Sequence, residues 1–434
     1  MKNTYDVIVV GGGPAGSTAA ALLAKDGVDV LLVDKEQFPR YTVGESLIPH
    51  FWKFTDLLGV TQEIEDAGFI RKSGGVVYWD NMVRKIQFKD FGYTRPGLHV
   101  ERDEFDNILL NNAKRLGVEV VEKMMALQVA DLEGEVSRVL LQPVGGTEAD
   151  QQWVSAKAII DATGQQCMIS KQEEIKNYDS AFRFQSIWGY YDKADYYYAI
   201  DEKTDFENRH SIPPLTLVSS VGENWGWCWH IVMKEKVSIG LVLPKSSLQK
   251  FKESGDNIEE RFVNMVKTVP IINETLANSN FIPNSIYSIR DYSYRSEKLR
   301  VGNCYLVGDA AAFVDPISSA GVPMGMYAGI LASWCVSNTL RRPHRKPFFS
   351  EFYEKTLGMR LDLFRLLAYP SSILPPELMQ QGRDVIRMSS VSENQLVLAQ
   401  SMVTNRGQNF PDLLEEMGYE AQKLFEERVH HAAY

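Results

Sequence analysis

The feature that most restricts the fold of this chain lies at its beginning, where a strand, a glycine-rich turn, a helix and a second strand follow one another. Residues 6–10 read Asp-Val-Ile-Val-Val, a run typical of a strand covered on both faces of a parallel sheet. The turn 11–16, Gly-Gly-Gly-Pro-Ala-Gly, leads into 17–25, which is rich in alanine and leucine and favours a helix. Residues 28–33 form the next strand and end at Asp34. The order predicts a βαβ unit of a Rossmann-like α/β domain.

Each small residue of this turn has a physical role if a dinucleotide binds there. Gly11 permits the tight turn, Gly13 lets the backbone approach a pyrophosphate, and Gly16 lets helix and strand pack closely. The amino end of the helix presents unpaired N–H groups to the phosphates. Asp34 follows Gly11 at about the spacing of the acid that accepts hydrogen bonds from a ribose. The sequence therefore predicts a bound dinucleotide.

The rest of the chain divides by pattern. Residues 158–164 and 303–312 read as further buried strands of the same sheet, whereas the segments between and before them are rich in aromatic and alternating strand patterns. Apolar residues recur at helical spacing after Arg341. We expect a discontinuous nucleotide domain, a mainly antiparallel β-sheet domain on the substrate side and a helical C-terminal region. The nucleotide domain is expected to comprise 1–75, 100–176 and 291–340. The β-sheet domain would comprise 76–99 and 177–290, and the helical region 341–434.

Composition excludes several classes of function. The net charge is −10 and there is no basic block, which argues against a nucleic-acid partner. The four cysteines have no paired spacing, so we expect neither a disulfide framework nor a metal site; they are Cys167, Cys228, Cys304 and Cys335. No apolar run is long enough to span a membrane and no signal peptide precedes the first strand, so we expect a cytoplasmic protein.

Tryptophan is concentrated in one short segment. Three of the eight tryptophans lie between Trp225 and Trp229. On a strand, Trp227 and Trp229 point to the same face and would form a rigid apolar wall that keeps water and bulky substrate from a reactive cofactor. The alternative is that they only pack a core, since aromatic residues favour strands.

Further motifs follow in order along almost the whole chain. They are the loop 38–49, with Phe-Pro-Arg40 and Gly-Glu-Ser46, the turn 161–164, Asp-Ala-Thr-Gly, and the pair Gly308-Asp309. With the βαβ unit, they resemble the FAD-dependent monooxygenases of the hydroxybenzoate-hydroxylase type.

Within that superfamily the chain most resembles the flavin-dependent halogenases. Trp227 to Ile231 reads Trp-x-Trp-x-Ile, and 313–321 fits the pattern Phe-x-x-Pro-x-x-Ser-x-Gly. Lys72 stands at the position of the halogenase lysine.

The resemblance implies that reduced FAD and dioxygen oxidise chloride or bromide to hypohalous acid, which reaches an electron-rich aromatic ring through a tunnel. Lys72 would orient or capture this oxidant, and it forms the expected catalytic set with Trp227, Trp229 and Ser319. Backbone N–H groups of Ala320 and Gly321 would hold the halide. The expected contacts of FAD are Gly11, Gly13, Ala15, Gly16, Asp34, Arg40, Ser46, Arg102, Gly308, Asp309 and Val322.

Other readings of these residues stay open at this point. Lys72 could be a solvated surface residue, and Ser319 could cap a helix, the commonest role of a serine before an apolar helical run. Arg40 could be an ordinary loop cation. Glu45 and Ser46 could contact the flavin or only form a turn. The histidines show no metal-ligand spacing, so we expect structural or surface roles for them.

Two positions depart from the family pattern. Val232 stands where the tryptophan motif usually ends in proline, and Ser318 stands where halogenases of free tryptophan carry a glutamate. The second change favours the branch that acts on phenols or pyrroles in natural-product biosynthesis, often tethered to a carrier protein. Because no second glycine-rich unit for NAD(P)H is visible, we expect a separate flavin reductase. An aromatic hydroxylase, a double-bond (prenyl) reductase and a non-catalytic flavin- or carrier-binding module are the alternatives.

Overall fold

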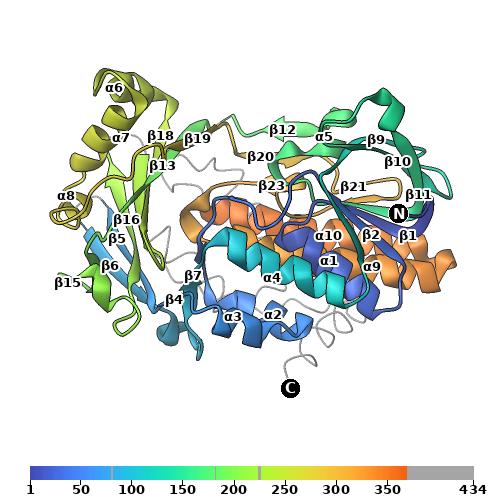
Figure 1. The fold of residues 1–434 in the computed structure, drawn as a ribbon, viewed down its shortest axis with the longest axis horizontal. Coiled ribbons are helices and arrows are strands. Elements are labelled where there is room, and N and C mark those ends of the chain that lie inside the picture. The colour runs from blue at the N-terminus through green and yellow to red at the C-terminus, as the bar shows by residue number, and fades with distance from the viewer. Residues whose placement is uncertain (80–81, 181, 223–225, 369–434) are drawn as a thin grey trace.

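The chain contains two large β-sheets, which lie toward opposite ends of the molecule in Figure 1 with helices and loops between them. The computed structural model describes residues 1–79, 82–180, 182–222 and 226–368. Trp225 and residues 369–434, the larger part of the expected C-terminal helical region, lie outside the described residues.

The first sheet contains the βαβ unit and has eight strands. Its central strands run parallel: β1 (Thr4–Val10) pairs with β2 (Val30–Asp34) on one side and β11 (Gln152–Asp161) on the other. The remaining strands are β8 (Glu119–Glu122), β9 (Met124–Ala130), β10 (Ser137–Pro143), β21 (Arg300–Val301) and β22 (Cys304–Leu306). The strand expected at 303–312 is shorter in the structure. It corresponds to β22, which ends at Leu306, and the chain turns at Gly308.

Long helices cover this sheet. They are α1 (Pro14–Lys25), α4 (Arg102–Arg115), α9 (Gly321–Arg341) and α10 (Lys346–Ala368). In Figure 1, α9 and α1 lie side by side, and both helices contribute to one hydrophobic core with β1, β2 and β11. The predicted Rossmann-like class is confirmed by this parallel sheet and its helices.

The second sheet has seven strands and is antiparallel except for one pair. In spatial order the strands are β19 (Tyr287–Arg290), β13 (Phe184–Tyr191), β18 (Val237–Pro244), β17 (Gly226–Val232), β16 (Leu215–Val221), β5 (Gly74–Trp79) and β6 (Met82–Gln87). Short helices pack on its outer face; they are α6 (Leu248–Glu253), α7 (Ile258–Lys267) and α8 (Pro270–Asn273). Its inner face turns toward the first sheet (Figure 1).

A small sheet of three strands connects the two large ones. It consists of β3 (Ser46–Leu47), β7 (Gly97–His99) and β4 (Ile70–Lys72), with β7 in the middle. The other elements are α2 (Trp52–Leu58), α3 (Thr61–Asp66), α5 (Met168–Gln172), β12 (Lys176–Tyr178), β14 (Tyr196–Ala199), β15 (Glu202–Thr204), β20 (Tyr294–Ser296) and β23 (Ala312–Phe313).

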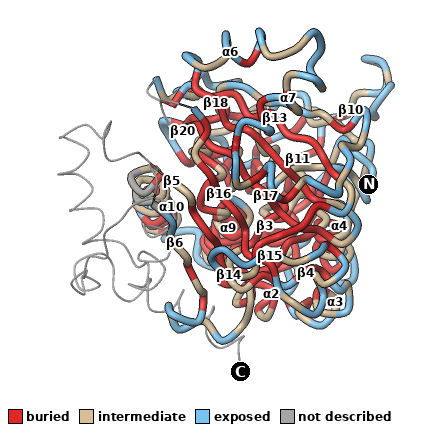
Figure 2. The backbone as a smooth tube through the Cα atoms, turned by 90° about the vertical axis from the view of Figure 1, so that its left-hand side faces the viewer, coloured by how far each residue is buried: buried red, intermediate tan, exposed pale blue. Residues whose placement is uncertain are grey.

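Burial follows this architecture. In Figure 2 the buried backbone runs through β16, β17 and β18 and continues through β11. None of the helices in the described part of the chain combines the length and the apolar character that crossing a membrane requires.

Candidate active site

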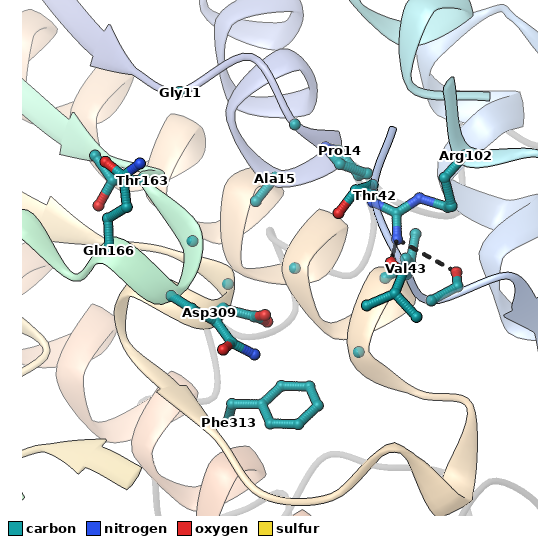
Figure 3. Close-up of a pocket in the computed structure, with 18 of the residues that line it drawn as sticks. Gly11, Pro14, Ala15, Thr42, Val43, Arg102, Thr163, Gln166, Asp309 and Phe313 are labelled. Carbon is teal, nitrogen blue, oxygen red and sulfur yellow. Dashed lines mark hydrogen bonds between the residues drawn. The ribbon is translucent and has the colours of Figure 1, made fainter. Parts of the chain in front are cut away.

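A cavity of about 780 Å³ extends from the glycine turn to the tryptophans of β17. Most of the predicted site residues line it: Gly11, Gly13, Ala15, Asp34, Arg40, Ser46, Arg102, Trp227, Trp229, Gly308, Asp309, Ser319, Gly321 and Val322. Figure 3 shows Gly11, Ala15, Arg102 and Asp309 among the residues around this space. Gly16, Lys72 and Ala320 do not lie on its wall. Both large sheets and the small connecting sheet contribute to one space.

The nucleotide end of the cavity has the geometry that FAD requires. Gly11 has a φ of +110°, and a Cβ there would lie 2.2 Å from the carbonyl oxygen of Ala162. A Cβ on Gly16 would lie 1.9 Å from the carbonyl oxygen of Gly11, so this glycine permits close packing without reaching the cavity. The first turn of α1 has no side-chain cap, which leaves its N–H groups for a phosphate. These residues fit a dinucleotide.

Asp34 and Asp309 supply carboxylates at this end. Asp34 lines the cavity and accepts the N–H of Gly12 at 2.6 Å and that of Glu36 at 2.8 Å. Burial raises the pKa of Asp309 to about 6, although the nearby Arg102 opposes this shift. Both carboxylates therefore stand where ribose or ribityl hydroxyls can donate to them.

Two arginines share a single buried carboxylate. Arg102 binds Asp106 through Nε at 2.8 Å and Nη2 at 3.0 Å, and Arg40 binds the same group through Nη1 at 2.9 Å. Arg102 also donates to the carbonyl oxygens of Val43 and Gly44, drawn as dashed lines in Figure 3. The arginines thus fix the loop that precedes Ser46 against α4, and both residues line the cavity.

The two tryptophans of β17 form a continuous wall. Trp227 and Trp229 are 4% and 6% exposed, and their ring centroids are 5.7 Å apart. Gly240 of β18 lies beneath Trp229, since a Cβ at this position would be 2.1 Å from the indole ring. Both rings line the cavity, whereas the side chain of Val232 packs on the opposite face of the sheet. The departure at Val232 therefore does not touch the indole wall.

Lys72 is fully buried, which contradicts its alternative reading as a surface residue. Its Nζ donates to Ser46 Oγ at 2.6 Å and to Thr216 Oγ1 at 3.2 Å. Ser46 Oγ in turn lies 2.9 Å from Ser319 Oγ. Ser46, Thr216 and Ser319 all line the cavity, so the ammonium group stands directly behind its wall.

The polarity of this cluster can be assigned from burial. Burial lowers the pKa of Lys72 to about 7, and burial, with the charge of Lys72 as a lesser cause, lowers that of His99 well below its ordinary value. A neutral His99 donates from Nδ1 to the carbonyl oxygen of Val232 at 2.9 Å. Its Nε2 then accepts the Thr216 hydroxyl at 2.8 Å, which leaves the oxygen of Thr216 to accept from Lys72. The sequence indicated no role for Thr216, and it favoured a structural or surface role for His99.

The halide loop lies on the other side of Ser319. Asp315 accepts the N–H of Ile317 at 3.0 Å and the hydroxyl of Tyr292 at 3.2 Å, and burial raises its pKa to about 7. The next helix, α9, has Ala320 as its N-cap residue and makes no side-chain cap. The alternative reading of Ser319 as a helix cap is therefore wrong, and the N–H groups at Ala320 and Gly321 begin a helix beside the cavity.

Other chemistry is not assembled in the described residues. Across residues 1–79, 82–180, 182–222 and 226–368, no three side chains of the metal-ligating types gather as a metal site would require. The four cysteines are free and buried.

Comparison with known proteins gives a consistent answer. The tryptophan halogenase family model matches residues 6–96 and 82–365. The tryptophan 2-halogenase of Chondromyces crocatus is 33% identical over 358 residues, covering 82% of this chain and 65% of that protein. The 1H-pyrrole-2-carbonyl-[peptidyl-carrier protein] chlorinase of Pseudomonas fluorescens is 31% identical over 353 residues, 76% of this chain and 75% of its own length.

The solved structures agree at the level of the fold. The myxobacterial chondrochloren halogenase, described as a variant of the FAD-dependent halogenases, superposes with a TM-score of 0.74 and 24% identity, covering 100% of this chain and 91% of its own. The resemblance drawn from the motifs is thus confirmed, as are the expected flavoprotein class and its cofactor, and halogenation is favoured over the hydroxylase and reductase alternatives. The chain belongs to the tryptophan halogenase family, a family of FAD-dependent halogenating enzymes.

Proposed function

We propose that this protein halogenates an electron-rich aromatic ring, a phenol or a pyrrole, using reduced FAD, dioxygen and chloride or bromide. The observation that carries this proposal is the position of Lys72. Its buried ammonium group is bonded to Ser46 and linked through it to Ser319, and both serines line the cavity whose other end is the glycine turn. Burying an ionisable amine costs folding free energy, so a lysine in this place indicates a functional role and not a structural one.

The residues divide the work between the two ends of the cavity. The glycine turn, Asp34 and the arginines would hold FAD. With dioxygen, the reduced cofactor would oxidise the halide. The N–H groups at Ala320 and Gly321 bind the halide, and Trp227 and Trp229 keep the organic substrate and water away from the flavin. With a pKa of about 7, Lys72 can donate a proton from Nζ to the oxygen of hypohalous acid, or act as the free amine that captures halogen.

The finer assignments rest on single observations. A relative is named as a chlorinase of a carrier-bound pyrrole, which supports a substrate tethered to a carrier protein. A separate reductase would deliver the reduced flavin, since the chain shows one glycine-rich dinucleotide turn. Four free thiols suit a reducing compartment such as the cytoplasm.

The test combines the protein with FAD, a flavin reductase, bromide or chloride, and a panel of phenols and pyrroles. We expect halogenated product by mass spectrometry. Lys72→Ala should retain FAD and lose product at least a hundredfold, whereas Lys171→Ala, which changes an exposed lysine of α5, should behave as the native protein. An oxygenated product formed without any halide requirement would identify a hydroxylase instead.

A further inference from the structure

A buried carboxyl group in the halide loop, residues 313–321, is used by none of the steps above. Asp315 is 9% exposed, and one of its oxygens accepts the N–H of Ile317 at 3.0 Å. The hydroxyl of Tyr292 donates to the other oxygen at 3.2 Å, and the indole N–H of Trp227 is a third donor. Because these donors come from different segments, the carboxyl group ties the loop to β17 and to the residues before β20.

Asp315 stands one hydrogen bond behind the cavity wall. Ile317, Tyr292 and Trp227 all line the cavity, whereas Asp315 does not. Its carboxyl group therefore does not meet a ligand of the cavity directly. It acts on such a ligand through its charge and through the groups that it holds in place.

The loop that carries Asp315 closes on itself at the place proposed for the halide. A Cβ on Gly321 would lie 3.5 Å from the ring of Phe313, so the two ends of the loop are in contact. The Phe313 ring also packs edge-on against that of Tyr292, with 5.8 Å between the centroids. Asp315 is therefore enclosed in the same compact loop as the N–H groups that would hold the halide.

An ionised carboxylate in this loop opposes the binding of an anion, because like charges repel strongly where water is excluded. The groups that face it carry no compensating charge. The amide of Ile317 and the indole of Trp227 do not titrate, and burial, together with the charge of Asp315, raises the pKa of Tyr292 well above its ordinary value. Burial also raises the pKa of Asp315 to about 7, so this group can take up a proton near neutral pH.

The proposed reaction itself consumes a proton with each halide. The halide enters as an anion and leaves as neutral hypohalous acid. Balanced, the reaction converts reduced FAD, dioxygen, one halide and one proton into FAD, hypohalous acid and water. Dioxygen receives two electrons from the flavin and two from the halide. A site that takes up the anion and a proton together keeps its net charge unchanged.

We propose that Asp315 is a positioning residue that couples halide binding to proton uptake: its carboxyl group takes a proton as the halide enters the loop, which removes the opposing charge while the loop stays tied to Trp227. The inference rests on the proposed function and adds a proton requirement to its halide site. The acid form of Asp315 predominates below about pH 7 and tolerates the anion, whereas the ionised form repels it. Halide should therefore bind more weakly as the pH rises through this value.

The test uses Asp315→Asn and, as a matched control, Asp195→Asn. Asparagine has the shape of the protonated acid and keeps an oxygen that can accept the N–H of Ile317. Asp195 is also 9% exposed and burial raises its pKa as well, but it lies off the cavity wall. The affinity of the oxidised, FAD-loaded protein for chloride is measured without turnover, from the broadening of the chloride NMR line between pH 6 and pH 9. Calorimetry in two buffers of different ionisation enthalpy gives the protons taken up.

We expect the native protein to bind chloride at least tenfold more weakly at pH 9 than at pH 6, and to take up about half a proton or more per chloride near pH 7.5. Asp315→Asn should change less than threefold over this range and should match the native affinity at pH 6. Asp195→Asn should follow the native curve. A native affinity that does not change with pH, or an Asp315→Asn protein that binds chloride much more weakly than the native protein at pH 6, would overturn the inference.

Lys72 is the other group whose proton could produce such a dependence. Burial lowers its pKa to about 7, and Ser46 connects it to Ser319 of the halide loop. The chloride titration is therefore repeated with Lys72→Met, which we expect to retain the tenfold change. A pH dependence that Lys72→Met loses, or that Asp315→Asn keeps, would assign the proton to another group and contradict the role of Asp315.

A second pair of variants keeps the inference testable if Asp315→Asn does not fold. Tyr292→Phe leaves the carboxyl group in place but removes one of its donors, so the midpoint of the chloride dependence should move to higher pH. Tyr287→Phe, which alters an exposed ring off the cavity wall, should leave the midpoint unchanged. An unmoved midpoint in Tyr292→Phe would count against Asp315.

The outcomes separate this inference from the proposed function. A native protein that forms no halogenated product would refute the proposed function, while the chloride titrations would still decide the role of Asp315. Chloride binding without a pH dependence would overturn the inference alone. A native protein that binds no chloride at any pH would overturn both the halide site and the role of Asp315.

Discussion

Replacing Lys72 by methionine should make the protein more stable at neutral and lower pH while abolishing halogenation. Methionine is similar in length to lysine and carries no charge, so it removes the ionisable amine with little change in volume. Burial lowers the pKa of Lys72 from 10.5 to about 7. Each pKa unit corresponds to about 1.4 kcal/mol, so burying the protonated amine costs about 5 kcal/mol of folding free energy below pH 7.

The pH dependence follows from proton counts. Between pH 7 and 10.5 the unfolded chain holds a proton on Lys72 that the folded chain has lost, so the stability of the native protein rises with pH across this window. The variant lacks this rise. It also loses the hydrogen bonds to Ser46 and Thr216, together about 2 kcal/mol. We expect Lys72→Met to be about 3 kcal/mol more stable than the native protein at pH 6 and slightly less stable at pH 10.

The assay is urea unfolding with saturating FAD at one-unit steps from pH 6 to 10. Lys171→Met, which alters an exposed lysine, serves as the control and should follow the native curve. If Lys72→Met were less stable than the native protein at pH 6, the desolvation argument would be refuted, and Lys72 would be a structural residue.

Three further substitutions test other parts of the site. Gly240→Ala places a Cβ 2.1 Å from the indole of Trp229, so the wall should shift, and hydrogen peroxide released per flavin oxidised should rise several-fold in a peroxide assay. Gly16→Ala places a Cβ 1.9 Å from a backbone carbonyl oxygen of the turn, and flavin fluorescence should report FAD affinity at least tenfold weaker. Asp315→Ala leaves a buried tyrosine hydroxyl and a backbone amide without their acceptor, which should cost about 2 kcal/mol in urea unfolding.

The nucleotide half of the fold could be predicted from sequence because its signals are local. Strand, turn and helix follow one another within 4–34, and each small residue acts on its neighbours in the chain. The same-face geometry of Trp227 and Trp229 likewise needs only the period of a strand. The strand expected at 158–164 corresponds to the last part of β11, which begins earlier, at Gln152, and ends at Asp161.

The cluster around Lys72 could not be predicted in the same way. Ile70, Arg71 and Lys72 form a strand of three residues whose alternation is buried, exposed, buried, and no local pattern shows which face is inward. Thr216 lies next to Lys72 because β16 and β5 pair in parallel. His99 joins the cluster through Thr216, because β7 lies between β3 and β4. These pairings join distant segments, so the motifs indicated Lys72, Ser46 and Ser319 separately but neither their contact with one another nor the part of Thr216.

The hydrogen-bonded cluster of Ser46, Lys72, Thr216 and Ser319 draws its members from four separate stretches of chain. A molecule in which β4 has briefly detached from its sheet would still bind the flavin, because the glycine turn belongs to another sheet. Such a molecule would continue to consume reduced flavin, but the hypohalous acid would diffuse away without reacting at the substrate. The measure of an intact preparation is therefore the ratio of halogenated product to reductant consumed, and a yellow, cofactor-loaded sample gives no assurance of it.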